Sequence, residues 1–303
     1  MIDQGSNHRL HGLSVRVVRW ECQLALVREC PGMSLEALFA GTPLYDRVAR
    51  SMSRRITSAE HPTQPRYDAA LMDRQDPQPL LEARLWPLTG SYAFFDADIG
   101  DVAEILAAWQ RGLGMDPVEE QVKGGLEASL GLLQPMSLGH RELLVPTASP
   151  WTAYFGDGRT GADEAPVGQL AKMLRRRALL VTWWPVPGYW ALRFQLYADH
   201  RTDFLNYERV VSVDTDDGGR TAFTATGTPQ PYESVEAYRA RRVRDRFTPA
   251  MLETYCRALG VQPFAPDFFG TESVLITSHD WRPDIRFTVA DQQARYGFSP
   301  PRK

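Results

Sequence analysis

Apolar and polar residues alternate most regularly in the middle of the chain. In segment 190–197 the large apolar residues occupy every second position, and smaller or polar residues lie between them. This two-residue period predicts a strand with one buried face and one wet face. Segments 206–213 and 220–226 are also strand-like, and they flank DTDDGG, whose acidic and glycine residues readily adopt the positive φ angles of a tight turn. We therefore predict a β-hairpin there.

A helical period replaces this alternation in four places. One predicted helix follows the aromatic strand SYAFF with Asp98 as its N-cap, and a second carries Val167, Leu170, Ala171 and Leu174 on one face. A third is expected from about Ser234 to Arg246, and a fourth begins at Thr248 as N-cap and ends before Gly260. Each of these segments has enough apolar positions to cover a sheet.

Short apolar runs bounded by glycine or proline predict the remaining strands. These runs are VKGGLEASLGLL, RELLVP, WTAYF, ALLVTWW and SVLIT. Because several predicted strands follow one another directly, we expect antiparallel pairing. The sequence thus predicts an α+β fold, with a mainly antiparallel sheet packed by three to four helices.

The first 84 residues differ from the rest of the chain. Scattered arginines and the polar, proline-bearing stretch 53–84 lack a steady period, although residues 18–26 alternate as a strand would. We expect residues 1–84 to form a poorly ordered or peripheral N-terminal leader, and residues 85–303 to form the globular α+β domain. Three internal methionines are alternative translation starts for this leader: Met33, Met52 and Met72.

Composition and charge indicate which partners and which cellular compartment suit the chain. The chain of 303 residues is 43% hydrophobic and has a formal charge of -3, so it has no general attraction for nucleic acid or anionic lipid. Its three cysteines form no CxxC pair, and their odd number does not suit a disulfide framework. With neither a signal peptide nor a long apolar run, the sequence predicts a cytoplasmic protein that does not enter the membrane.

The common catalytic signatures are missing from the sequence. There is no GxxxxGK[ST], no GxGxxG after a strand, no HExxH and no GxSxG. The strongest acid–base candidate is the loop after segment 190–197, where His200 could act as a base oriented by Asp199 or Asp203, and Arg201 could bind an anionic group. The competing interpretation is a solvated turn, which the composition favours.

Two groups of residues are candidates for binding. Trp183 and Trp184 are adjacent in a predicted strand and must point to opposite faces, so one of them could serve with Tyr189 as an exposed aromatic anchor. The segment 234–246 carries the second group: Arg239, Arg241, Arg242, Arg244 and Arg246. Glu236 and Asp245 interrupt this run, so an acidic protein partner ranks ahead of RNA or DNA, and a solvated helix with internal ion pairs ranks ahead of both.

Ligand sites built on loops have weaker support. In FGDGRTGADE, backbone amides and Arg159 could cradle a phosphate, but the three acidic residues would repel it, and an ordinary flexible loop is favoured. Metal binding by His140, His279 and Asp280 has no supporting spacing. The acidic residues of the predicted hairpin are Asp214, Asp216 and Asp217. They are not followed by the glutamate that a calcium-binding loop requires. We predict no metal and no cofactor.

These observations favour a non-enzymatic protein-binding protein whose partner is another protein. A bacterial toxin-neutralising, immunity-type role is one instance of such a function. The alternative is a hydrolase or transferase that acts on an anionic small molecule or nucleotide with the His/Asp/Arg group at residues 199–203.

Overall fold

The computed structural model describes residues 77–137, 141–186, 188–200, 206–215, 219–279 and 285–300. All of them belong to one compact unit, residues 64–303. Most of the predicted leader, including the alternation at residues 18–26, lies outside the described residues. Leu80 and Ala83 are buried in the 3-10 helix η2 (Leu80–Ala83), so packed structure is already present before Leu85.

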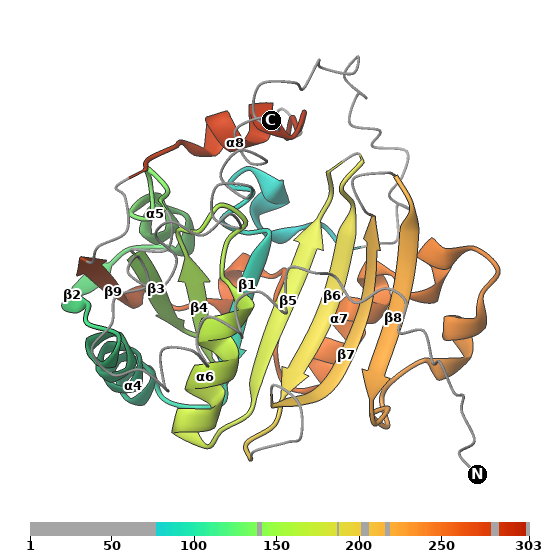
Figure 1. Cartoon of the computed structure of the whole chain (residues 1–303), viewed down its shortest axis with the longest axis horizontal. Coiled ribbons are helices and arrows are strands. Elements are labelled where there is room, and N and C mark those ends of the chain that lie inside the picture. Colours follow the sequence, from blue (N-terminus) through green and yellow to red (C-terminus); the bar gives the residue numbers. More distant parts are fainter. Residues whose placement is uncertain are drawn as a thin grey trace, which may run out of the picture. The chain divides into compact units, whose positions relative to one another are not determined.

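The described strands form a nine-stranded sheet in which every pair of neighbours is antiparallel (Figure 1). The order is β2-β9-β3-β4-β1-β5-β6-β7-β8. The strands are β1 (Ser91–Phe95), β2 (Asp116–Lys123), β3 (Arg141–Pro146), β4 (Thr152–Gly156), β5 (Ala178–Trp184), β6 (Ala191–Tyr197), β7 (Tyr207–Thr215), β8 (Thr221–Gly227) and β9 (Glu272–His279). The prediction of a mainly antiparallel α+β fold is confirmed.

Helices lie on both faces of this sheet. The α-helices in the described residues are α4 (Ile99–Gly112), α5 (Leu126–Gly131), α6 (Glu164–Leu174), α7 (Pro249–Ala258) and α8 (Val289–Arg295). The 3-10 helices other than η2 are η3 (Val235–Arg239), η4 (Val243–Arg246) and η5 (Pro266–Phe268). None of the helices in the described ranges is long and apolar enough to cross a membrane.

Two separate apolar clusters hold these layers together. Phe95 packs with α4 and α6 on one face of the sheet, whereas its neighbour Phe94 packs with α7 on the other face. Figure 1 shows α4 and α6 in front of the sheet and α7 behind β6 to β8. Because β1 and β4 are buried on both faces, their sequences are continuous apolar runs rather than alternations.

The predicted hairpin and the fourth predicted helix are confirmed. Strands β7 and β8 pair from Thr215↔Thr221 onward. Helix α7 starts where expected, because the hydroxyl of Thr248 accepts a hydrogen bond of 3.3 Å from the Met251 N–H, and Pro249 takes the first helical position. Both features depend on neighbours in sequence, and so the sequence reveals them.

The expected strand VKGGLEASLGLL is wrong in its second half. Strand β2 ends at Lys123, and residues 126–131 form helix α5 instead. Leu126 and Leu130 lie four residues apart on one side of this short helix, and both are buried. The glycine pair between Lys123 and Leu126 ends the strand and lets the chain turn into the helix.

The predicted helix from Ser234 to Arg246 is also wrong. The segment forms two short 3-10 turns, η3 and η4, separated by an extended stretch. Tyr238 and Val243 both pack against the core cluster on the α7 side. Five residues of α-helix would place these two side chains about 140° apart around the helix axis, so one continuous helix could not bury both. Packing therefore overrides the helical propensity of the arginines.

Candidate interaction surface beside strand β8

Residues 234–246, which we call the arginine segment, carry five arginines and two acidic residues. Helix η4 contacts β8 and β7, and η3 contacts η4. In Figure 1 this orange segment lies beyond β8, at the edge of the sheet. Four of its arginines are exposed: Arg239, Arg241, Arg242 and Arg244. The segment therefore brings an excess of positive charge to this edge of the sheet.

The five arginines fall into two groups. The guanidinium of Arg244 lies 5.5 Å from the centre of the Trp190 ring, and that of Arg246 lies 6.0 Å from the centre of the Phe223 ring. Arg246 also donates a hydrogen bond of 2.9 Å from Nε to the carbonyl of Ala240. Among the described residues, the side chains of Arg239, Arg241 and Arg242 form neither an ion pair nor a hydrogen bond, so their guanidinium donors remain available to a partner.

A buried ion pair fixes the chain just before this segment. Arg209 on β7 and Glu233 have side chains that are only 3% and 0% exposed, and their closest atoms, Nη2 and Oε2, are 2.6 Å apart. Arg209 Nε donates to Glu233 Oε1 at 2.9 Å, and the Gln230 N–H donates to the same oxygen at 2.8 Å. Arg209 also donates to the carbonyl oxygen of Gly227 at 2.9 Å. These bonds join β7, the end of β8 and the turn that leads into η3.

Two tyrosines complete this buried network. The hydroxyl of Tyr238 donates to Glu233 Oε2 at 2.7 Å and lies 3.0 Å from the hydroxyl of Tyr255 on α7. The Tyr255 oxygen in turn accepts a bond of 2.8 Å from the Ser234 N–H. Burial, together with the bonds to Tyr255 and Glu233, raises the pKa of Tyr238, so this hydroxyl stays protonated and remains a donor. The arginine segment is thus attached to the sheet through groups other than its exposed arginines.

The outer edge of β8 has unpaired backbone groups. The Thr215 N–H donates a hydrogen bond of 2.9 Å to the Trp190 carbonyl. The backbone N–H and C=O of Thr215 therefore point toward β6, and those of Asp214 point toward β8. Because the direction alternates along a strand, the N–H and C=O groups of Phe223 and Ala225 point away from β7. In the described part of the chain no hydrogen bond reaches these four groups, and Ala225 is exposed.

The structure separates the predicted aromatic anchors. Trp183 and Trp184 point to opposite faces, as the alternation predicted, but Trp183 is only 2% exposed and packs edge-on against Phe264. Trp184 is half-buried and contacts Trp86, with ring centres 6.2 Å apart. Tyr189 is 36% exposed, and its ring contacts that of Tyr296. Trp183 therefore belongs to the core and not to a surface.

The predicted acid–base residues are only partly described. His200 and Asp199 form a hydrogen bond of 2.7 Å between Nδ1 and Oδ1, and their side chains are 74% and 60% exposed. This bond lowers the pKa of Asp199. Arg201 and Asp203 lie outside the described residues. The described pair therefore lies in solvent, without the water-excluding surroundings that strengthen acid–base catalysis.

The glycine-rich loop before α6 is packed, which corrects the expectation of a flexible connection. Asp157 is fully buried, accepts a bond of 2.7 Å from the Ser137 hydroxyl and pairs with Arg141 at 3.2 Å. A side chain at Gly161 would overlap the carbonyl oxygen of Ser91. The guanidinium of Arg159 lies 5.6 Å from the centre of the Phe287 ring. The buried carboxylate of Asp157 makes this loop a poor place for a phosphate.

No group of three histidine, cysteine or acidic side chains is placed to hold a metal ion within the described ranges. His140, Asp216, Asp217 and Asp280 lie outside those ranges. His279 is the last residue of β9 and is exposed.

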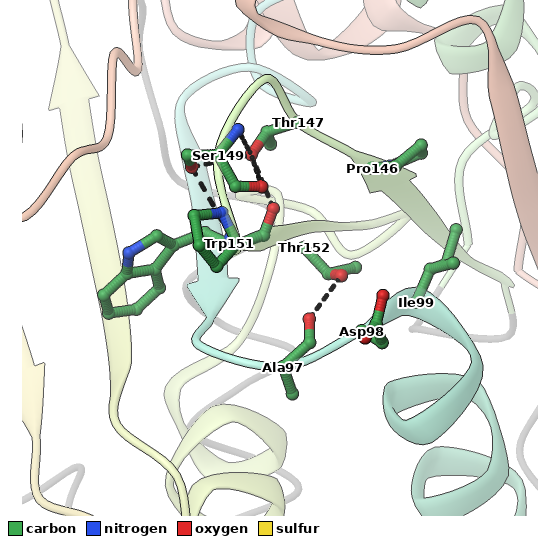
Figure 2. A pocket seen from close by; sticks show the side chains of 9 residues that line it. Ala97, Asp98, Ile99, Pro146, Thr147, Ser149, Trp151 and Thr152 are labelled. Carbon is green, nitrogen blue, oxygen red and sulfur yellow. Dashed lines mark hydrogen bonds between the residues drawn. The ribbon is translucent and has the colours of Figure 1, made fainter.

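A pocket of about 170 Å³ lies beside the N-terminus of α4 (Figure 2). The Thr152 hydroxyl in it donates to the Ala97 carbonyl at 2.7 Å, and the Thr147 hydroxyl donates to the Trp151 carbonyl at 2.6 Å. Ligand pockets usually measure about 300 to 1,000 Å³, so this one is small. Its threonine hydroxyls are already used, Thr147 within the β3–β4 connection and Thr152 in a bond to the β1–α4 connection.

Sequence reasoning missed the buried network behind the arginine segment. Arg209 shares a strand face with Val211 and Val213, both of which are buried in the core. A cation in the apolar phase of a strand requires a buried partner, and this signal was present in the sequence. The identity of the partner, Glu233, depends on tertiary structure.

Comparison with known proteins identifies no relative. No family model, no curated protein and no solved structure matches this chain.

Proposed function

We propose that this chain is a non-enzymatic, cytoplasmic protein-binding protein whose arginine segment recognises an acidic region of another protein. The observation that carries the proposal is the exposure of Arg239, Arg241 and Arg242, whose guanidinium groups have no ion pair or hydrogen bond among the described residues. The buried bonds of Glu233 and Tyr238 hold the segment in place before any partner arrives. Such preorganisation lowers the conformational entropy lost on binding.

Two features favour a protein partner over nucleic acid. Arg244 lies over the ring of Trp190 and Arg246 over that of Phe223, so these two rings are already paired with cations rather than open to bases. Glu236 and Asp245 also interrupt the run of arginines, which disfavours a continuous phosphate backbone. Neutralisation of a toxin is one form that this binding could take, and the identity of the partner tests it directly.

The hydrolase or transferase alternative stays a prediction. Half of its proposed residues, Arg201 and Asp203, lie outside the described part of the chain. The exposure of His200 and Asp199 provides no specific observation in its favour. We therefore put the protein-binding proposal first.

The test begins with affinity purification from the native host and identification of a stoichiometric partner. Purified partner is then titrated by calorimetry against the wild type and against the triple variant Arg239→Glu, Arg241→Glu, Arg242→Glu. We expect the variant to bind at least about a hundredfold more weakly, because each reversal replaces an attraction with a repulsion. Higher salt should also weaken the wild-type complex.

A matched control reverses the same amount of charge on α6 and its C-terminal turn. Lys172, Arg175 and Arg176 are exposed there, and their replacement by glutamate should change affinity less than about threefold. Equal losses in the two triple variants would mean that only net charge matters and would contradict the proposal. Failure of the wild type to retain any stoichiometric protein would contradict it as well.

A further inference from the structure

We propose that the unpaired edge of β8 binds an extended acidic segment of the partner as an additional antiparallel strand. This inference rests on the proposed function and specifies its binding mode. The backbone of β8 would supply hydrogen bonds, and the arginine segment would select the side chains. Strand addition of this kind is a recurring way of recognising peptides.

The backbone geometry meets the first requirement. The N–H and C=O groups of Phe223 and Ala225 point outward and have no hydrogen bond among the described residues. Ala222 and Thr224 are exposed, so the rim is open on the face opposite α7. An edge strand with such a row of unpaired groups is a template for another strand.

The sequence of β8 does nothing to block this pairing. Its residues, TAFTATG, include no charged residue and no proline, and they are rich in threonine and alanine. Natural edges that avoid pairing carry lysine, other charges, proline or a bulge. The opposite edge of the sheet, β2, has the sequence DPVEEQVK and so carries both charges and a proline.

The positions of the arginines define the side-chain pattern of the added strand. Phe223 directs its ring to the α7 side, where it contacts Tyr238 and the guanidinium of Arg246. A partner residue directly opposite Phe223 would direct its side chain to the same side, toward the arginine segment. Because side chains alternate, the segment that fits best has an acidic residue at every second position and threonine or valine between them.

The same geometry disfavours a second copy of this chain as the occupant. Pairing of β8 with β8 about a two-fold axis would place two arginine segments next to the same pair of strands. Like charges at such a contact repel each other. An acidic segment of another protein relieves this repulsion instead.

The probe is a synthetic eight-residue peptide in which glutamate alternates with valine or threonine, with both ends blocked. We expect it to bind the full chain and to slow hydrogen exchange at the amides of Phe223 and Ala225, with no change at Val118 on β2. In antiparallel pairing the glutamate N–H groups face β8, because residues directly opposite share a face and a hydrogen-bonding phase. Methylation of the glutamate nitrogens should therefore weaken binding at least tenfold, whereas methylation of the other nitrogens should change it less than threefold.

Matched variants of the protein test the same backbone hydrogen bonds by changing β8 instead of the peptide. Ala225→Pro removes an outward N–H and leaves the pairing with β7 intact, and it should reduce peptide affinity at least tenfold. Ala225→Val keeps the N–H and should bind as the wild type does. Thermal melting of both variants shows whether the fold is retained.

Several outcomes would overturn the inference. Absence of peptide binding, or equal affinity for the two methylated peptides, rules out strand addition, and the reversed methylation pattern rules out the antiparallel register. Self-association of the free chain that Ala225→Pro abolishes would make a second copy the occupant. If the peptide still binds normally to the Arg239, Arg241, Arg242 triple variant, the proposed function fails while strand addition stands.

Discussion

The two edge strands of the sheet, β2 and β8, differ in where their charged side chains lie. Strand β2 carries charge on the edge itself, at Glu119, Glu120 and Lys123, and includes Pro117. Strand β8 is uncharged, and its charges lie on the neighbouring arginine segment and on a buried pair behind it. Charge on an edge blocks further pairing, whereas charge beside an edge leaves the backbone accessible. Strand β2 is thus protected against pairing with a further strand, whereas the outer backbone of β8 is open to it.

The ion pairs at the two edges differ as strongly. Lys123 and Glu272 join β2 to β9 at 3.3 Å with side chains 83% and 72% exposed, whereas Arg209 and Glu233 are almost fully buried. Exposed ion pairs contribute little to the free energy of unfolding because water screens them. Removing one partner of a buried pair leaves the other charge buried with neither a counter-charge nor water. Stability should therefore respond very differently to the same substitution at the two edges.

The largest effect is expected from Glu233→Gln. The substitution leaves the buried guanidinium of Arg209 without its counter-charge, and the free energy of unfolding should fall by about 3 to 5 kcal/mol. Urea denaturation measures this change. The double variant Arg209→Met, Glu233→Leu should recover part of the loss, since it removes both charges. A loss below about 1 kcal/mol for the single variant would contradict the buried-pair description.

Tyr238→Phe should have the next largest effect. It removes the hydroxyl that donates to Glu233, and a hydrogen bond to a buried charged group contributes about 1.5 to 3 kcal/mol. Urea denaturation again gives the change, and hydrogen exchange should become faster at η3. Tyr189→Phe is the matched control, because this tyrosine lies near the surface and contacts its neighbour through the ring. Equal effects in the two variants would be inconsistent with the network.

Removing the protection of β2 should make the two edges alike. The variant Pro117→Thr, Glu119→Thr, Glu120→Thr should self-associate at concentrations about tenfold lower than the wild type, because β2 would lose the residues that block pairing. Sedimentation velocity measures this shift. A control with the same charge change away from the edge is Asp101→Asn, Glu104→Gln on α4, and it should sediment as the wild type does. Identical behaviour of both variants would show that net charge, not edge pairing, controls association.

The smallest effect is expected from Glu272→Gln, the substitution made at the protected edge. The exposed pair with Lys123 should contribute no more than about 1 kcal/mol, and less in high salt. Urea denaturation at low and high salt measures it beside Glu233→Gln. A loss comparable to that of Glu233→Gln would remove the contrast between the two edges.

Local sequence signals accounted for much of the fold. The acidic and glycine residues of DTDDGG predicted the β7–β8 hairpin, and Thr248 with Pro249 predicted the start of α7. The alternation in segment 190–197 predicted β6 and its apolar face, but the expected wet face is wrong, because Ala191, Gln195 and Tyr197 are buried as well. In each case the residues that decide the structure are neighbours in the chain, so no knowledge of distant contacts was needed.

The candidate surface was less predictable because distant contacts determine it. The arginines were visible in the sequence, but their presentation on 3-10 turns depends on the packing of Tyr238 and Val243 against the sheet. Trp183 could not be told from Trp184 by alternation alone, since either face could have been covered. The unpaired backbone of β8 follows from its place at the end of the strand order, which composition does not reveal.

The bonds of Glu233 have a consequence for how this protein could diversify. The carboxylate accepts hydrogen bonds from Arg209, from the Gln230 amide and from Tyr238, and none of these donors is an exposed arginine. Residues 239, 241 and 242 can therefore change identity at little cost in folding. A descendant that keeps the hydrogen-bond network of Glu233 and replaces those three side chains would inherit the scaffold and acquire a different binding specificity.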